Sequence, residues 1–299
     1  LIKCENSLNI CHLGGSPFTS NNKMPCLSCI KVNKSLYKDV NQIKLENIKN
    51  YNQSLNGLNV EKLKNYKYKG FDIGKMVTSS VIWIKRTPTL KETDSEYFKK
   101  LISDGIKLID YFEKLNLDLY TGVIVFNGAS FPESILYDIC KKQDINVATF
   151  EGGLSYNNKY SIEFNYGITA QHRFNFDKNI KIPESKLNSS LNLMKTQWVE
   201  GENVKENYFS NEANLDLSDK KIISIFGNVS WDTSQFISNT IFTSIFDWLE
   251  SLKEVIKEFP EYTFIFRAHP GENRKLKQTF YGVGNWLKDN LSSDLKNVL

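Results

Sequence analysis

An arginine, a histidine and a glutamate lie within six residues of one another, at Arg267, His269 and Glu272. They directly follow an aromatic and β-branched run at 262–266, which predicts a short buried strand. A proline and a glycine among them favour a turn. In open α/β sheets ligands bind outside the carboxyl ends of strands, where a guanidinium offers a planar fork of donors to phosphate and an imidazole offers another. The pattern predicts an anion site; the alternative is that Arg267 pairs with a surface carboxylate and His269 caps the turn.

A strand–helix–strand unit is predicted in the middle of the chain. Residues 119–126 and 146–150 have the composition of buried strands, and a helix is predicted from the proline at 132 to Lys142. About thirty residues of this pattern are typical of two parallel strands joined by a crossover helix.

Each of these two strands is followed by a polar residue and glycine, Asn127-Gly128 after the first and Glu151-Gly152 after the second. The carboxyl ends of parallel strands lie at one edge of the sheet, so these residues are expected to face one crevice. Glu151 could serve as a general base or bind a hydroxyl, and the glycines allow a sugar or phosphate to approach the backbone. The alternative is that Glu151 caps the next element.

A second α/β region is predicted towards the end of the chain. A strand at 221–226 is followed by a loop and by an amphipathic helix that ends at Pro260, before the strand at 262–266. The polar stretch 201–219 has the composition of an interdomain linker.

Four of the five cysteines lie in residues 1–35: Cys4, Cys11, Cys26 and Cys29. Together they could form a tetrahedral structural zinc site, with the C-x2-C pair as its knuckle. Buried free thiols and disulfides are the alternatives, of which disulfides fit a cytosolic protein least well.

Composition and charge limit the classes of protein to which this chain can belong. The 299 residues are 40% hydrophobic and 24% charged, which is typical of a globular chain of one large or two medium domains. A formal charge of +4 does not indicate a nucleic-acid-binding protein. The lysine-rich part at 31–75 is either a solvated face or a basic surface that meets a membrane or a lipid-linked acceptor. Without a long apolar run or signal peptide, a cytoplasmic protein is expected, with the inner face of the cell membrane as a further option.

Arg267-x-His269-Pro270 after an apolar strand resembles the motif of bacterial capsule and surface-polysaccharide glycosyltransferases with the GT-B architecture. The resemblance implies an α/β fold of two Rossmann-like parallel-sheet domains facing a cleft. The implied domains are an acceptor-side domain at 1–200 and a nucleotide-sugar-binding domain at 220–299 that is expected to be incomplete, joined by the 201–219 linker.

The resemblance also implies an activity, the transfer of a sugar from a nucleotide-activated donor to a surface or capsular glycan. Arg267 and His269 would hold the donor phosphate, with Glu272 beside them, and His269 and Glu151 would be catalytic. The cleft would be lined by Asn127, Gly128, Gly152 and Asn228. No catalytic metal is expected, because the chain has no Asp-x-Asp triplet. A sugar epimerase, a polyol-phosphate transferase and a non-catalytic glycan-binding module remain as alternatives.

Overall fold

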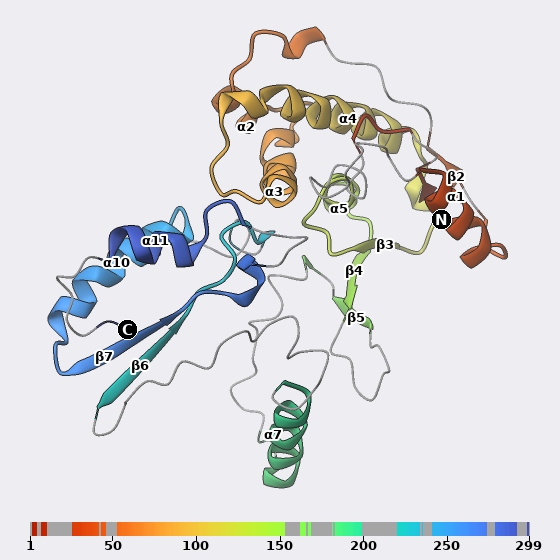
Figure 1. The fold of residues 1–299 in the computed structure, drawn as a ribbon. Coiled ribbons are helices and arrows are strands. Elements are labelled where there is room, and N and C mark those ends of the chain that lie inside the picture. The colour runs from red at the N-terminus through yellow and green to blue at the C-terminus, as the bar shows by residue number, and fades with distance from the viewer. Residues whose placement is uncertain are drawn as a thin grey trace. The chain divides into compact units, whose positions relative to one another are not determined.

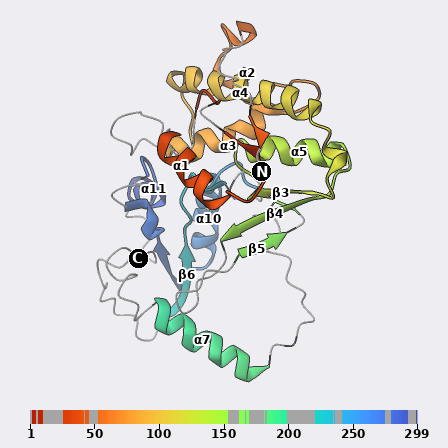
Figure 2. The ribbon, with the colours of Figure 1, turned by 90° about the vertical axis from the view of Figure 1, so that its right-hand side faces the viewer.

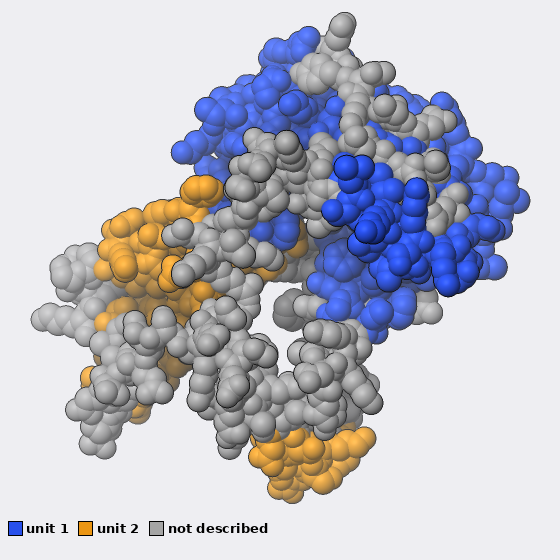
Figure 3. All heavy atoms as spheres, turned by 45° about the vertical axis from the view of Figure 1, so that its right-hand side comes forward, with its two compact units in different colours: residues 1–173, 236–238 blue, residues 174–235, 239–299 orange. Residues whose placement is uncertain are grey.

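The computed structural model describes residues 2–4, 7–10, 26–41, 43–45, 53–152, 162–165, 167–168, 181, 183–198, 220–233, 235, 241–273, 279–291 and 298. The chain divides into two compact units (Figure 3). Unit 1 consists of Leu1–Arg173 with Phe236–Ser238, and unit 2 of Phe174–Gln235 with Asn239–Leu299. Helices and small, largely parallel sheets occur together, so the predicted α/β class is confirmed.

The central sheet of unit 1 has the strand order β3-β4-β5 (Figure 1). Strands β3 (Val123–Phe126) and β4 (Val147–Gly152) are parallel, and helix α5 (Glu133–Lys142) connects them, which confirms the predicted strand–helix–strand unit. The third strand, β5 (Ile162–Asn165), runs antiparallel to β4 and lies in a region that the sequence analysis did not assign to a strand. A separate parallel pair joins β1 (Ile2–Lys3) and β2 (Ile43–Lys44).

Helices α3 (Ile73–Lys85) and α4 (Ser95–Lys114) pack with α5 around the main core of unit 1 (Figure 2). Apolar residues recur at three- and four-residue spacing along α4, and the corresponding side chains are buried. One face of the sheet contributes Val125 and Val147 to the same core. In contrast, helix α1 (Cys26–Leu36) has no buried residue among its described side chains.

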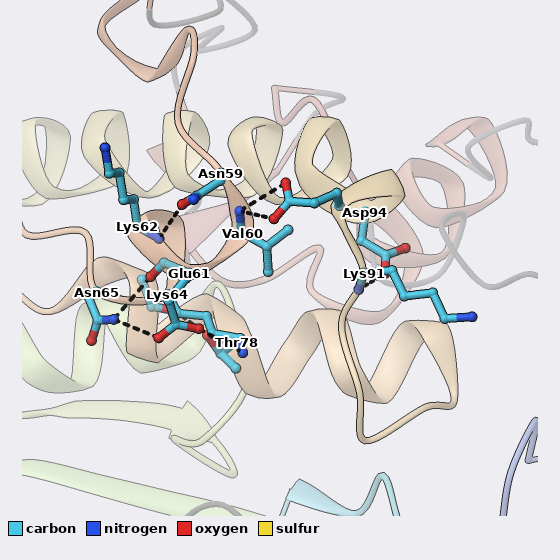
Figure 4. Close-up of polar contacts among 11 residues, drawn as sticks. Asn59, Val60, Glu61, Lys62, Lys64, Asn65, Thr78, Lys91 and Asp94 are labelled. Carbon is cyan, nitrogen blue, oxygen red and sulfur yellow. Dashed lines mark hydrogen bonds and ion pairs between the residues drawn. The ribbon is translucent and has the colours of Figure 1, made fainter.

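Short elements and their caps connect these helices. They are α2 (Val60–Lys64) and the 3-10 turns η1 (Gln53–Leu55), η2 (Glu92–Asp94) and η3 (Leu117–Leu119). Figure 4 shows the Asn59 side chain accepting from the backbone N–H of Lys62, which caps α2. The backbone N–H of Val60 donates to the Glu92 carboxylate at 3.1 Å, so a residue 32 positions later fixes the same helix end.

Unit 2 contains a parallel pair, β6 (Lys221–Phe226) and β7 (Tyr262–Arg267), both at the predicted positions. The intervening helix is α10 (Ile245–Glu258), and α11 (Val283–Asn290) packs beside it. Phe266 of β7 and Ala268 contact this helix pair. The turn η4 (Pro270–Asn273) follows β7, and α7 (Glu184–Trp198) lies earlier in the same unit.

The largest sheet among the described residues has three strands in unit 1 and two strands in unit 2. Sheets of this size show the α/β class but not two Rossmann-like domains. The predicted linker at 201–219 lies outside the described residues. Among the helices of the described part, none has the length and apolarity needed to cross a membrane.

Gly74 allows the close approach of α2 and α3. A Cβ atom at this position would collide with the carbonyl oxygens of Leu63 and Lys64. Replacement of a helical glycine by alanine ordinarily stabilises a helix by about 1 kcal/mol. For Gly74→Ala we expect the opposite, a loss of about 1–3 kcal/mol in unfolding free energy, because overpacking outweighs helix propensity. Chemical denaturation measures it, with Gly152→Ala as the control, since a Cβ at Gly152 meets nothing within 4 Å. Equal stability of the two variants would contradict the expected collision.

Asp104 ties the N-terminal segment to α4. Its buried carboxylate accepts hydrogen bonds from the backbone N–H of Asn9 at 2.8 Å, the Asn9 side-chain amide at 2.6 Å and the backbone N–H of Ile10 at 3.3 Å. Burial raises the pKa of Asp104 to about 7, although the hydrogen bonds from Ile10 and Asn9 lower it.

The raised pKa predicts a pH dependence of stability. The unfolded chain releases this proton near the ordinary pKa of 3.8, while the folded chain holds it to about 7. The contribution to the unfolding free energy is therefore fully present below 3.8 and is lost as the pH rises through about 7. Denaturant titrations at several pH values give the unfolding free energy as a function of pH. In the Asp104→Asn variant the decrease with rising pH that Asp104 causes should be absent, because an amide does not titrate. Asp118→Asn, which changes an exposed side chain, should retain it. The expectation fails if wild type and Asp104→Asn show the same slope.

Candidate functional sites

The carboxyl edge of β6 and β7 brings together four residues predicted from the sequence: Asn228, Arg267, His269 and Glu272. The last register pair of the two strands is Phe226 with Arg267, and the N–H of Gly227 donates to the Arg267 carbonyl at 2.9 Å. Asn228 therefore directly follows the end of one strand, while Arg267 ends the other. The residues of the predicted anion site thus lie at the end of a parallel pair, while anion binding itself stays a prediction.

His269 has a defined tautomer. Its Nδ1 accepts a hydrogen bond from the backbone N–H of Gly271 at 2.9 Å, so Nδ1 carries no proton and the proton of the neutral ring is on Nε2. A Cβ at residue 271 would lie 2.8 Å from this Nδ1, so glycine is required for the imidazole to fold back. The half-buried ring presents Nε2–H as a donor, which suits an anionic ligand.

Glu272 is engaged with the backbone of α11. Its Oε1 accepts from the N–H of Val283 at 2.7 Å and its Oε2 from the N–H of Gly284 at 3.1 Å. Burial raises the pKa of Glu272, opposed by the hydrogen bonds from Gly284 and Val283 and by the nearby His269. Gly282 is needed here because a Cβ would collide with the Glu272 carboxyl group. The sequence pattern places Glu272 with the donor-binding residues, whereas both of its carboxylate oxygens cap a helix N-terminus, a position that stabilises an anion.

The loop after β6 is fixed to the segment before α11. Ser230 Oγ donates to the carbonyl of Tyr281 at 3.1 Å, and the buried Trp231 indole N–H donates to Thr279 Oγ1 at 2.8 Å. The Asn228 side chain accepts from the N–H of Val229 at 2.8 Å and so shapes its own loop. These contacts make the strand ends of unit 2 a preorganised edge.

The carboxyl edge of β3 and β4 holds the second predicted group, Asn127, Gly128, Glu151 and Gly152. Asn127 has a left-handed backbone with φ of 56°, and its amide nitrogen donates to Glu151 Oε2 at 3.3 Å. The same side chain accepts from the N–H of Ala129 at 3.1 Å. The structure therefore places the predicted base and amide side by side. A Cβ at Gly128, with φ of 78°, would lie 2.9 Å from the Thr149 methyl group.

Two buried serines of α3 hold the loop after β3. Ser79 Oγ donates to the carbonyl of Ala129 at 3.2 Å, and Ser80 Oγ accepts from the N–H of Phe131 at 2.8 Å. The sequence shows these serines as polar residues in an apolar helix, a signal for a buried polar contact whose partner it does not reveal. The loop leads into α5, where burial raises the pKa of Glu133.

The cysteine prediction falls partly outside the described residues, because Cys11 is not among them. Cys26 and Cys29 lie on helix α1 rather than in a knuckle turn, and Cys4 is exposed after β1. Within the described part of the chain, no three histidine, cysteine, aspartate or glutamate residues are grouped to hold a metal. The structural zinc site stays a prediction.

Comparisons of this chain with protein-family models, curated proteins and solved structures found no match. Functional inference therefore rests on the two strand edges themselves.

The position of Glu272 predicts a structural phenotype. In Glu272→Gln one oxygen becomes an NH2 group, which cannot accept from the second of the two α11 amides. We expect a loss of roughly 1–3 kcal/mol in unfolding free energy, the cost of an unsatisfied buried donor. Denaturation of unit 2, followed by tryptophan fluorescence, measures the change. Glu254→Gln is the control, because its exposed pair with Lys257 should contribute less than about 1 kcal/mol. Equal stability of the two variants would show that the α11 cap is dispensable.

Proposed function

We propose that this protein is a glycosyltransferase that moves a sugar from a nucleotide-activated donor to a surface or capsular glycan. The observation that carries the proposal is the position of Arg267 and His269 at the carboxyl end of β7, with His269 Nδ1 occupied by the N–H of Gly271 and its Nε2 left as the ring donor. A guanidinium and an imidazole donor at this edge suit the phosphate groups of such a donor. The finer architecture, two Rossmann-like domains in the GT-B plan, belongs to this proposal.

Within the proposal, unit 2 binds the donor. Arg267 is exposed at the end of β7 and supplies charge and bidentate hydrogen bonds to a phosphate. His269 donates from Nε2 and stabilises the negative charge that grows on the departing nucleotide. Glu272 contributes indirectly, because its bonds to α11 fix the turn that carries His269.

Unit 1 supplies the acceptor side. Glu151 would take the proton from the acceptor hydroxyl as it attacks the sugar, the general-base step of an inverting transfer. The amide of Asn127 donates to one oxygen of Glu151 and so orients the carboxylate. The expected site of action at the inner face of the cell membrane is part of the same proposal.

Substitution of the two donor-site residues tests the proposal. In Arg267→Ala the affinity for CMP-, UDP-, GDP- or CDP-linked sugars should fall by roughly 10- to 100-fold, because hydrogen bonds to a charged group are lost. His269→Ala should weaken binding less and slow turnover. Isothermal titration calorimetry measures the affinity, and release of free sugar from the donor measures slow hydrolysis. Lys257→Ala is the matched control, an exposed cation of α10 in the same unit.

The outcomes separate the alternatives. Binding of a nucleotide sugar with slow hydrolysis supports a transferase. Binding of free glycan alone would support a non-catalytic module instead. Unchanged donor affinity and turnover in both variants would remove Arg267 and His269 from the mechanism.

A further inference from the structure

Phe226 shares a sheet face with Arg267. The two residues are the last register pair of the parallel strands, and paired residues of neighbouring strands project to the same side. The opposite face of β7 carries Phe264, which is 2% exposed, and Phe266, which packs against α10 and α11. Alternation along the strand therefore directs Arg267 and Phe226 away from these two helices.

Phe226 is the most exposed large apolar residue of β6. Its side chain is 69% exposed, against 40% for Ile222 and 37% for Ile223 on the same strand. An aromatic ring on the surface offers a large flat apolar face. Phe226 is the register partner of Arg267, and His269 follows Arg267 by two residues in the chain.

The chemistry of this group matches a nucleotide. A nucleotide presents a flat base at one end and anionic phosphates at the other. An aromatic ring stacks on any base through its face, while a guanidinium binds phosphate through its planar fork of donors. Gly227, which follows Phe226, serves the packing of α11, because a Cβ atom there would lie 2.9 Å from a Val283 methyl group.

We propose that Phe226 is the base-stacking residue of a nucleotide site whose phosphates are held by Arg267 and His269. This inference rests on the proposed function and adds to it the residue that recognises the base. Stacking on a phenyl ring involves no hydrogen bond to the base, so Phe226 supplies affinity without selecting between cytosine and uracil. Selection among bases then depends on other groups of the site.

Calorimetry on the intact chain with three probes tests the inference: cytidine 5′-monophosphate, uridine 5′-diphosphate and inorganic pyrophosphate. Phe226→Ala should lower the affinity for both nucleotides about fivefold or more, since the stacking contact is removed. The affinity for pyrophosphate should change by less than about twofold, because pyrophosphate has no base to stack. Phe226→Trp should retain nucleotide affinity, because an indole also stacks. Phe259→Ala is the control, since Phe259 is a 44% exposed ring located before the amino end of β7.

The design separates failure of this inference from failure of the proposed function. Unchanged nucleotide affinity in Phe226→Ala, with weakened binding in Arg267→Ala, would overturn the role of Phe226 and leave the phosphate site intact. Equal weakening of pyrophosphate and nucleotides in Phe226→Ala would also overturn it, because the ring would then act through the phosphate site. Absence of nucleotide binding by the wild-type protein would overturn both. Circular dichroism of each variant verifies that the fold is retained.

Discussion

The two hydrogen bonds from the N-terminal amides of α11 to the Glu272 carboxylate fix the geometry of the second unit. A buried carboxylate is unfavourable unless donors compensate its lost hydration, and a helix N-terminus supplies donors together with a favourable dipole. The backbone of Glu272 extends the link in both directions: its N–H donates to the His269 carbonyl and its carbonyl accepts from Thr279. Thr279 in turn accepts from the Trp231 indole in the loop after β6. Glu272, through its carboxylate and its backbone together, thus joins both strand ends to one helix.

Unit 1 uses the same physical device at its own strand edge. Buried serines of α3 bind the backbone of the loop after β3, and the Asn127 amide connects that loop to Glu151 at the end of β4. Asp104 binds the N-terminal segment in a similar way. In unit 1, short polar side chains on α3 and α4 satisfy the backbone of a loop and of the N-terminal segment, whereas in unit 2 a carboxylate in the turn η4 satisfies the first amides of α11. Such loops can carry exposed polar groups in a defined geometry.

The two strand edges differ in chemistry, and this difference supports different roles for them in the proposed reaction. The edge of unit 2 presents cationic and neutral donors next to an exposed aromatic ring, which is suited to a nucleotide with its phosphates. The edge of unit 1 presents a carboxylate oriented by an amide, which is suited to a hydroxyl group. A reaction that transfers a sugar from a phosphate to a hydroxyl needs both kinds of site. This pair of chemistries supports the proposed activity more directly than the fold class does, since α/β folds support many functions.

The sequence by itself determined the local elements of this protein. Periodic apolar residues predicted α10, and aromatic and β-branched runs predicted β4, β6 and β7, because helix and strand patterns are local properties of the chain. The grouping of Asn127 with Glu151 also followed from sequence, since the ends of neighbouring parallel strands lie at one edge. The antiparallel strand β5 was not predicted, because four residues of alternating apolar and polar type in a polar region give a weak signal.

Only the tertiary structure decided which groups each polar side chain binds and which face of the sheet each strand residue occupies. Glu272 lies in sequence beside Arg267 and His269, yet its oxygens bind amides more than ten residues further on. Phe226 reads in sequence as the end of a buried strand, but the register places it beside Arg267 on an exposed face. Ser79 and Ser80 find their partners about fifty residues away. Hydrogen-bond partners and sheet faces depend on contacts between distant segments, which no local pattern encodes.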